Sequence, residues 1–252
     1  MEFLVFQLQA PLSSWGDTAV GEYRGSYEHP GESALIGLLG AGLGMRREDE
    51  AAHTALLQGY GFAVGVQSSG KLLRDYHTAQ VPGRAALKGH PHATRRDELS
   101  VPKDALNTIL STRDYRQGAA CLVAIQPRRD PPHSLKTLAD KLHKPQFVLY
   151  LGRKSCPPAV PLYPKIITAD SVRAAFDDYI ARIKVRREEQ KDRKGRLPLE
   201  PVSQVTRLMW GDGIEAGVSP DLSMPRKDRL IRRRGWQFGD RIEHVALIQT
   251  GD

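Results

Sequence analysis

The chain has 252 residues, of which 40% are hydrophobic and 26% are charged. A chain of this length and composition is typical of a globular protein that has a real hydrophobic core and one large domain or two small ones. Its two cysteines, Cys121 and Cys156, exclude a disulfide scaffold and a four-thiolate zinc site, and they suit a reducing cytoplasm.

The sequence has no segment suited to a membrane. The longest apolar run, residues 34–44, is too short to span a bilayer, which takes about 20 residues. Glu2 stands where a secretory signal peptide carries basic residues. We therefore expect a cytoplasmic protein with no membrane partner.

Positive charge is concentrated in two segments. The formal net charge is +8 and the sequence pI is about 9.6, which favours a polyanionic partner, most often nucleic acid. Residues 182–196 hold eight Lys or Arg against three acids, and residues 226–234 hold six against one. Each segment has a net charge of +5, so the rest of the chain is close to neutral. Such runs are also common on solvated surfaces, so their role stays open.

In chain order, the first predicted element is a strand at residues 2–9, where apolar residues occupy both faces. Residues 17–32 have no clear period and read as a loop. An apolar run with four glycines, 34–44, predicts a helix packed closely against a sheet, with Ser33 as its N-cap. A second helix is predicted at 48–58, because acids occupy its first turn.

Next, residues 60–67 and 72–78 alternate as strands, and we expect them to pair through the "SSG" turn. Residues 79–118 are rich in Pro, Gly, His and Arg and have little apolar period, so they form a long insertion. A buried strand is predicted at 119–126. Leu135, Leu138 and Leu142 have helical spacing within a predicted helix at 131–144, and a strand is predicted at 146–152.

This order of elements predicts an α+β fold with a ferredoxin-like, RRM-like domain at residues 1–150 that carries the insertion 79–118. The rest of the chain, 151–252, begins with a Pro-rich stretch and continues with a charged helix near 170–190. It ends with a strand at 241–249. We interpret 151–252 as a smaller, mostly β C-terminal subdomain with basic segments.

The stretch "GVQSSGKLLRDYHT", residues 65–78, resembles a phosphate-binding loop only in its first half. Leu72 has no hydroxyl for magnesium, and a strand rather than a helix follows Lys71. His90 and His92 lie in the insertion, but no His, Cys or carboxylate spacing in the sequence is typical of a metal site. We therefore predict neither a cofactor nor a metal.

Arg74, Asp75, Tyr76 and His77 are the strongest candidates for an active site. Metal-independent RNA cleavage needs a base and a proton donor, and His and Tyr suit these roles. On a strand, however, Tyr76 and His77 point to opposite faces, whereas Arg74 and Tyr76 share one face. An Arg that binds phosphate beside a Tyr that stacks on a base fits this arrangement better.

A second candidate cluster, "YLGRKSCP" at residues 150–157, gathers Tyr150, Arg153, Lys154 and Ser155 after a predicted strand. Gly152 permits a tight turn that presents backbone N–H groups, as in a phosphate or nucleotide clamp. An ordinary basic turn explains the composition equally well.

Four motifs in order resemble one family. These are "LQAPLSSWGD", "ESALIGLLGAGLGMRRED", "LLRDYHTAQ", and "YLGRKSCP" followed by "PLY". Together they resemble the fifth family of CRISPR-associated proteins, in its type I-E CasD form, over roughly residues 1–165. The resemblance implies that the insertion 79–118 is the family's thumb.

The resemblance also implies a function: a non-catalytic subunit of Cascade that supports antiviral defence. Such a subunit binds the 5′ handle of the CRISPR RNA, caps the filament formed by the backbone subunit CasC, helps to seat the large subunit CasA, and contacts target DNA at most indirectly. Its relatives in type I-C systems cut repeat RNA, so the alternative is a metal-independent endoribonuclease that uses His77 or Tyr76. A third reading is an adaptor whose basic runs are only solvated.

From these arguments we predict RNA contacts in three places: the loop around Ser13, the insertion with its leading strand, and the cluster after Tyr150. The predicted RNA-binding residues are Ser13, Ser14, Trp15, Arg24, Arg74, Tyr76, His77, Arg84, Lys88, Arg95, Arg96, Lys103, Arg113, Tyr150, Arg153, Lys154 and Ser155.

Overall fold

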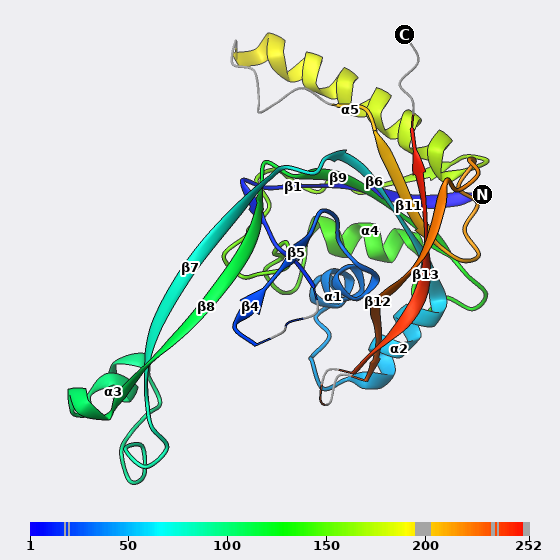
Figure 1. Ribbon diagram of the computed structural model, residues 1–252. Coiled ribbons are helices and arrows are strands. Elements are labelled where there is room, and N and C mark those ends of the chain that lie inside the picture. Colours follow the sequence, from blue (N-terminus) through cyan, green and yellow to red (C-terminus); the bar gives the residue numbers. More distant parts are fainter. Residues whose placement is uncertain (18, 20, 195–202, 233–234, 236, 249–252) are drawn as a thin grey trace.

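The protein is described by a computed structural model that covers residues 1–17, 19, 21–194, 203–232, 235 and 237–248. Its main feature is one sheet with helices on both faces, from which a long hairpin projects (Figure 1). The fold is therefore mixed α and β with antiparallel sheets, which agrees with the α+β class expected from the sequence.

Seven strands form the main sheet in the order β10–β1–β9–β6–β11–β13–β12, and all neighbouring strands are antiparallel. The seven strands are β1 (Glu2–Gln9), β6 (Tyr60–Ser68), β9 (Ala120–Pro127), β10 (Lys165–Thr168), β11 (Arg207–Gly211), β12 (Leu222–Arg232) and β13 (Gln237–Leu247). The predicted strands at 2–9, 60–67 and 119–126 correspond to β1, β6 and β9.

Alternate residues of the central strands pack on opposite faces of the sheet. In β1, Leu4, Phe6 and Leu8 belong to one hydrophobic core, and Phe3 and Val5 belong to the other. All five side chains are buried. A strand buried on both faces is apolar at almost every position, which is the pattern seen at 2–9.

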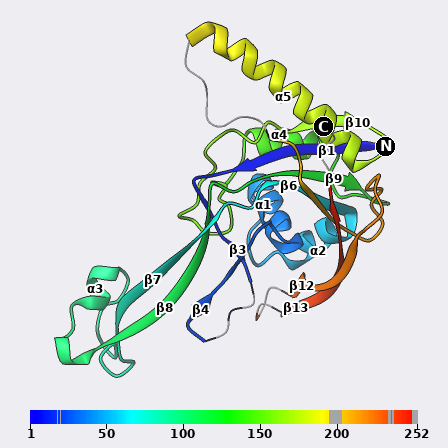
Figure 2. The same cartoon turned by 45° about the horizontal axis from the view of Figure 1, so that its top comes forward.

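Helices cover both faces of this sheet (Figures 1 and 2). Three helices, α1 (Glu32–Leu43), α2 (Glu50–Gly59) and α4 (Leu135–His143), pack on the face that carries Leu4 and Phe6. The longest helix, α5 (Val172–Lys194), covers the opposite face with its first half. The described residues form no helix that is long and apolar enough to cross a membrane.

The start of α1 differs from the prediction. Ser33 is not the N-cap, because the helix begins at Glu32 and its N-cap is Gly31, which has no side chain. The first turn is capped from a distant strand instead: the backbone N–H of Glu32 donates to Oδ2 of Asp228 at 3.0 Å. A carboxylate at this place also stabilises the positive end of the helix dipole.

The pairing predicted for residues 72–78 is wrong. They belong to β7 (Lys71–Pro82), which pairs along its whole length with β8 (Leu106–Gln117). β6 cannot accept β7 as a neighbour because β9 and β11 already occupy its two edges. β7 and β8 form a hairpin that projects from the sheet, with α3 (Arg95–Leu99) and the short 3-10 helix η1 (Lys103–Ala105) at its tip (Figure 1). The hairpin thus begins at Lys71 rather than near residue 79.

No strand forms at 146–152, although Leu149 and Leu151 are buried. The backbone there forms its hydrogen bonds with a helix instead of a strand. The N–H groups of Gln146 and Phe147 donate to the carbonyls of Gly42 and Ala41 at the end of α1. Alternating burial in this segment therefore comes from packing against α1. The neighbour of β1 on its outer side is β10 instead.

The C-terminal strands β11, β13 and β12 continue the main sheet directly beside β6. The boundary expected at residue 150 therefore does not coincide with a break in the sheet. β12 is the terminal strand, and its register with β13 shifts between Arg226 and Arg229 and again between Leu230 and Arg232. Each shift inserts an extra residue into β12.

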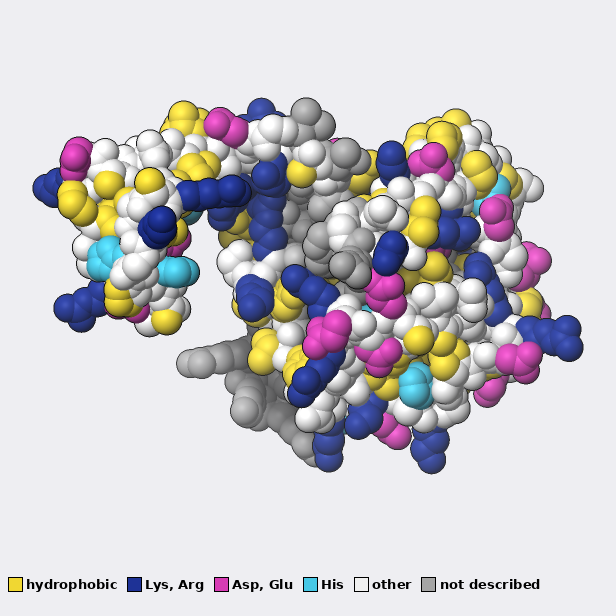
Figure 3. All heavy atoms as spheres, turned by 90° about the horizontal axis from the view of Figure 1, so that it is seen from below, with side chains coloured by type: hydrophobic (Ala, Val, Ile, Leu, Met, Phe, Trp, Pro, Cys, Tyr) yellow, Lys and Arg dark blue, Asp and Glu magenta, His cyan; other side chains and the backbone are white. Residues whose placement is uncertain are grey.

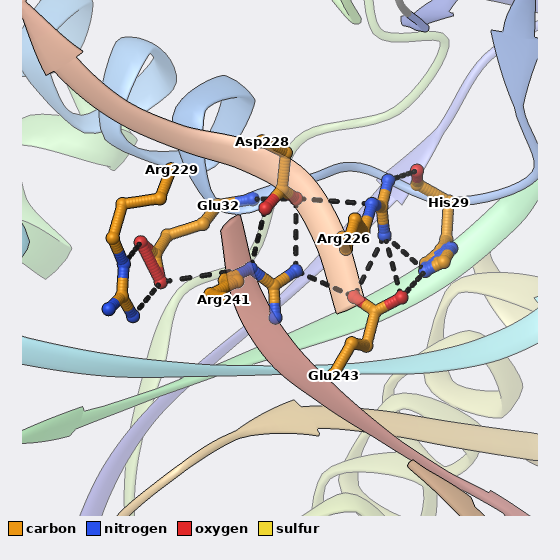
Figure 4. Close-up of polar contacts among 7 residues, drawn as sticks. All are labelled: His29, Glu32, Arg226, Asp228, Arg229, Arg241 and Glu243. Carbon is orange, nitrogen blue, oxygen red and sulfur yellow. Dashed lines mark hydrogen bonds and ion pairs between the residues drawn. The ribbon is translucent and has the colours of Figure 1, made fainter. Parts of the chain in front are cut away.

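A buried ion network joins β12 and β13 to the start of α1 (Figure 4). Asp228 accepts two hydrogen bonds from Arg241 at 2.6 and 2.9 Å. Glu243 accepts from Arg226 at 2.8 Å and from Arg241 at 2.6 Å, while Arg229 binds Glu32. Three guanidinium groups thus face three carboxylates, which makes the network neutral.

His29 adjoins this network without adding charge. Burial, followed by the charges of Arg226, Arg207 and Arg241, holds the pKa of His29 well below its usual value. The neutral ring accepts a hydrogen bond from Arg226 at 2.6 Å through Nε2. The approach of the same nitrogen to Glu243 at 3.2 Å is therefore not an ion pair.

Replacement of Asp228 by Ala should destabilise the protein strongly. It would remove the cap of α1 and leave Arg226 and Arg241 short of a buried partner, a change that costs about 3–5 kcal/mol in comparable buried pairs. The matched control is Asp178→Ala on α5, which loses an exposed pair with Arg182 and should cost less than about 1 kcal/mol. Urea unfolding of both variants measures the difference. Equal midpoints would contradict the role given to the network.

Candidate nucleic-acid interface

The base of the hairpin is held by short strands from the N-terminal loop. Strand β2 (Leu12–Ser13) pairs with β8 in antiparallel fashion, and β4 (Tyr23–Arg24) pairs with β8 in parallel fashion. Strands β3 (Trp15–Gly16) and β5 (Ser26–Tyr27) pair with each other beside them. The short strands β2 and β4 therefore fix the direction in which the hairpin leaves the sheet.

Asp114 of β8 is the centre of this base. Its buried carboxylate accepts hydrogen bonds from Arg74 at 2.9 and 3.1 Å and from the Tyr23 hydroxyl at 2.6 Å. The hydrogen bond from Arg74 holds the pKa of Asp114 below its usual value, against the effect of burial, and the bond from Tyr23 adds to this. Arg74 also lies over the Tyr23 ring, 5.4 Å from its centre.

The backbone carbonyl of Asp114 gathers two further residues. Ser14 Oγ donates to it at 3.0 Å, and Arg153 donates to it at 3.2 Å. The Arg153 guanidinium lies 4.6 Å from the centre of the Tyr115 ring. The structure thus brings together the predicted residues Ser14, Arg74 and Arg153, but their polar groups bind the protein itself.

Gly152 has no room for a side chain. Its φ is +86°, and a Cβ placed there would lie 1.7 Å from the carbonyl oxygen of Ser14. The N–H of Ser14 in turn donates to the carbonyl of Leu151 at 3.1 Å. Two loops that are far apart in sequence therefore touch backbone to backbone, and only glycine permits this contact.

The predicted residues of the N-terminal loop are mostly interior. The side chains of Ser13, Ser14 and Trp15 are buried, so they support the base of the hairpin rather than face solvent. Arg24 is exposed, and its guanidinium donates to the carbonyls of Gly21 and Tyr23.

A groove of about 1500 Å³ lies beside the base of the hairpin. Its sides are α1, the segment 147–154, residues 16, 17 and 19, and the facing parts of β12 and β13. Where α1 lines the groove, it presents mainly small residues, among them Ala34, Gly37 and Ala41, together with Leu38. A Cβ at Gly37 would meet no atom within 4 Å, so this position opens into the groove.

Cations and aromatic rings line the same groove. Lys154 comes from one side, Lys227 from the opposite side, and Arg46 from the segment after α1. These three make no ion pair with any residue that the structure describes. Tyr150 and Phe147 also line the groove, and they are 37% and 46% exposed. Unpaired cations beside exposed rings suit a single-stranded nucleic acid, because phosphates and unstacked bases then both find partners.

The predicted contacts on the hairpin are mostly exposed. Arg84, Lys88, Arg96 and Lys103 lie on the surface near its tip, and Arg113 is half-buried on β8. Arg95 is exposed but pairs with Glu98. Ser155 is exposed beside Lys154, beyond the base. Figure 3 shows Lys and Arg side chains on both sides of the notch between the hairpin and the body.

The residues of the nuclease alternative point apart, as the strand period predicts. His77 lies 3.9 Å from Asp75 on one face of β7. Tyr76 is 65% exposed and stands opposite Thr112 in the register of the hairpin. The strand therefore does not bring Tyr76 and His77 together on one substrate.

The basic segment 226–234 is largely part of the protein's own structure. Arg226 and Arg229 belong to the buried network, and Arg232 lies 4.0 Å from Glu50. Lys227 alone among the described cations of this segment faces the groove. Residues 233 and 234 are outside the described residues.

Three residues that line the groove were not predicted from the sequence: Arg46, Lys227 and Phe238. Arg46 was visible as the first basic residue after the glycine-rich run. Lys227 was visible only as one member of the basic segment 226–234. Phe238 gave no local signal, because its position beside α1 depends on tertiary contacts of β13.

Comparison with known proteins identifies the family. The model of the family described as CRISPR-associated protein (Cas_Cas5) matches residues 3–239, which is most of the chain. The chain belongs to this family. The resemblance found in the four sequence motifs is therefore confirmed. A relative, the CRISPR system Cascade subunit CasD of Escherichia coli (strain K12), is 29% identical over 185 residues, which cover 70% of this chain and 76% of the relative.

Two solved structures share the fold of this Cas5-family chain. One, described as a CRISPR RNA-guided surveillance complex, aligns with a TM-score of 0.61 and 23% identity over 97% of this chain and 89% of the other. The second, described as the crystal structure of a Cas protein, gives a TM-score of 0.59 and 20% identity over 97% and 94% of the two chains.

The pH dependence of the hairpin base follows from Asp114. Because its pKa is lowered on folding, its contribution to stability is complete above its unfolded pKa and is lost as the pH falls through the lower, folded-state pKa. At neutral pH, Asp114→Asn should therefore unfold at a lower urea concentration than the wild type. We expect this gap to close in acid, as urea titrations at successive pH values would show. A gap that stays constant with pH would mean that the carboxylate charge is unimportant.

Gly152→Ala should destabilise the protein far more than Gly213→Ala. Both glycines have a positive φ, +86° and +77°, but a Cβ at Gly213 meets nothing within 4 Å. Gly213→Ala therefore isolates the backbone penalty of about 1–2 kcal/mol, whereas Gly152→Ala adds a collision with Ser14. Thermal unfolding of the two variants separates the backbone penalty from the cost of the collision. Similar melting temperatures would show that the two loops are free to separate.

Proposed function

We propose that this chain is a non-catalytic subunit of a Cascade complex, and that its groove holds the 5′ handle of the CRISPR RNA. The relative from Escherichia coli is a Cascade subunit, and a solved structure with this fold is described as an RNA-guided surveillance complex. The single observation that carries the proposal is the groove itself: small residues of α1 form its floor, and Lys154, Lys227 and Tyr150 line it.

The architecture supports this proposal. β10, β1, β9 and β6 are neighbours in that order, with helices between the strands in sequence, as in ferredoxin-like RNA-recognition domains. In this proposal the hairpin of β7 and β8 is the family's thumb, and its exposed Arg84, Lys88 and Arg96 contact phosphates near the end of the handle. The rings of Tyr150 and Phe147 offer stacking surfaces for unpaired bases.

Within the same proposal, the subunit works in the cytoplasm and caps one end of the CasC filament, beside CasA. The base of the hairpin, centred on Asp114, fixes the direction of the thumb relative to the groove. Since His77 and Tyr76 lie on opposite faces of β7, the alternative of a repeat-cutting nuclease lacks a paired acid and base on this strand. The RNA assay below also tests that alternative.

Gly37→Leu should weaken RNA binding without destabilising the protein. Leu at this position would project into the open groove, and it is a better helix former than Gly by roughly 0.8 kcal/mol. We expect at least a tenfold loss of affinity for end-labelled repeat RNA, and little loss with Gly37→Ala. Native gels run in EDTA measure retention, and denaturing gels show whether the RNA is cut. A discrete cut in the wild type would replace our proposal with the nuclease.

Lys154→Ala combined with Lys227→Ala should lower the slope of log affinity against log salt by about 1.4, since each contact with single-stranded RNA contributes about 0.7. The control is Lys136→Ala with Lys165→Ala, which removes two exposed charges away from the groove. If both double variants lower the slope equally, the groove is not the binding site.

A further inference from the structure

A serine, a histidine and an aspartate form a hydrogen-bonded row on the last strands of the sheet. Ser223 Oγ on β12 lies 2.7 Å from Nδ1 of His244 on β13. Nε2 of the same ring lies 3.0 Å from Oδ1 of Asp212, in the turn after β11. None of the three residues lines the groove or belongs to the buried ion network.

Asp212 fixes which ring nitrogen of His244 carries the proton. An ionised carboxylate can only accept hydrogen bonds, so Nε2 is the donor in this contact. Nδ1 of the neutral ring then accepts the hydrogen bond that Ser223 Oγ donates. The row therefore has the order of nucleophile, base and orienting carboxylate that activates a serine for acyl transfer.

The ring of His244 is also supported by packing. Trp210 stands opposite His244 in the register of β11 and β13, and the two ring centres lie 5.6 Å apart. Trp210 is buried and belongs to the core under α5. Residues that stand opposite each other on neighbouring strands share one face of a sheet. The row therefore lies on the face opposite α1, separate from the groove.

Ser223 lies at the open edge of the sheet with its own N–H directed outward. Pro225, two residues on, has no N–H, so on this terminal strand its nitrogen faces away from β13. No register shift lies between Ser223 and Pro225, so Ser223 faces the same way. Its pair with His244 is then of the kind that exchanges no backbone hydrogen bonds, in which side chains approach most closely. The outward N–H can donate to an oxygen that gains negative charge beside Oγ.

A small apolar surface adjoins the nucleophile. Pro225 and Ile242 stand opposite each other in the register, and each lies two residues from a member of the Ser223–His244 pair. All four side chains therefore share one face. Pro225 is exposed, and Ile242 is 41% exposed. This surface is too small for a long chain, and it suits a short apolar acyl group.

We propose that Ser223 is a catalytic nucleophile that hydrolyses esters of short apolar acyl groups, with His244 as the base and Asp212 as a positioning residue. Ser223 Oγ attacks the ester carbonyl carbon while its proton passes to Nδ1 of His244. The N–H of Ser223 donates to the oxyanion. The bond to the alcohol then breaks, and the departing oxygen takes the proton from Nδ1. Water attacks the acyl serine by the same route, which releases the carboxylic acid and restores the hydroxyl.

The exposure of the row limits how fast this reaction can be. The side chain of Asp212 is 70% exposed, whereas that of His244 is 22% exposed. Water and salt therefore screen the carboxylate, which stabilises a charged imidazole less than a buried one would. We expect slow turnover of reactive esters. This activity does not depend on the part in Cascade proposed above, because the groove lies on the other face of the sheet.

The experiment uses the purified full chain and two probes. A fluorescent fluorophosphonate labels activated serines, as the serine oxygen bonds to phosphorus and fluoride leaves, and mass spectrometry locates the label. p-Nitrophenyl acetate measures hydrolysis. The variants are Ser223→Ala, His244→Gln and Asp212→Asn, and the control is Ser219→Ala, which removes an exposed serine from the loop before β12. Urea unfolding checks that each variant keeps the fold.

We expect the label at Ser223 and at least tenfold slower hydrolysis with Ser223→Ala and His244→Gln, while Ser219→Ala behaves as the wild type. Asp212→Asn should lower the maximal rate of labelling rather than raise the probe concentration that gives half of it. Wild-type protein that carries no label at Ser223, or that is labelled equally at Ser219, would overturn the proposal. Unchanged hydrolysis with Ser223→Ala or His244→Gln would do the same, and unchanged labelling kinetics with Asp212→Asn would refute the positioning role.

Discussion

The arrangement of the groove depends on one buried carboxylate. Asp228 caps the first turn of α1 and at the same time binds Arg241 on the neighbouring strand. Helix α1 and the last two strands form two sides of the groove, and the sequence between them spans most of the chain. This contact and the ion pair of Arg229 with Glu32 fix the start of the helix against the strands. Burying a carboxylate such as that of Asp228 requires that its partners be in place.

Carboxylates paired with arginines also anchor the hairpin. Asp114 is buried at its base, and Glu28 pairs with Arg116 of the hairpin and Arg207 of the sheet. Beyond this base the ribbon has only two strands, and both of its faces carry exposed residues. A two-stranded ribbon is only marginally stable on its own, so the contacts at its base determine the direction in which it projects. The groove and the thumb-like hairpin are thereby held in one fixed relation.

Local patterns were enough to find the central elements. β1, β6 and β9 are apolar on both faces, and α4 has leucines at helical spacing after a Ser134 cap, so sequence alone placed them. The strand predicted at 146–152 does not form. Alternation of apolar residues indicates which side chains are buried, but it does not show where the backbone hydrogen bonds go, and here they go to the end of α1. Likewise, the sequence could not show that Arg226 and Arg229 are neutralised, because Glu243 and Glu32 lie far away along the chain or on another strand.

The same distinction applies to the candidate site. Ser14, Arg74 and Arg153 were chosen as RNA contacts because their residue types suit phosphates, but each is bound to Asp114. The exposed cations of the groove come from segments whose meeting depends on tertiary contacts. Residue type identified the chemistry of the surface, while only the packing could tell which members of each basic cluster remain available to a ligand.

The two irregularities in the register of β12 protect the sheet from further growth. β12 is the terminal strand, and a regular strand at this place offers its unpaired backbone groups to any other strand. The extra residues near Lys227 and Ile231 bend the strand and interrupt that row of donors and acceptors. The distortion that lets Arg226 and Asp228 reach the interior thus also makes this edge a poor template for aggregation.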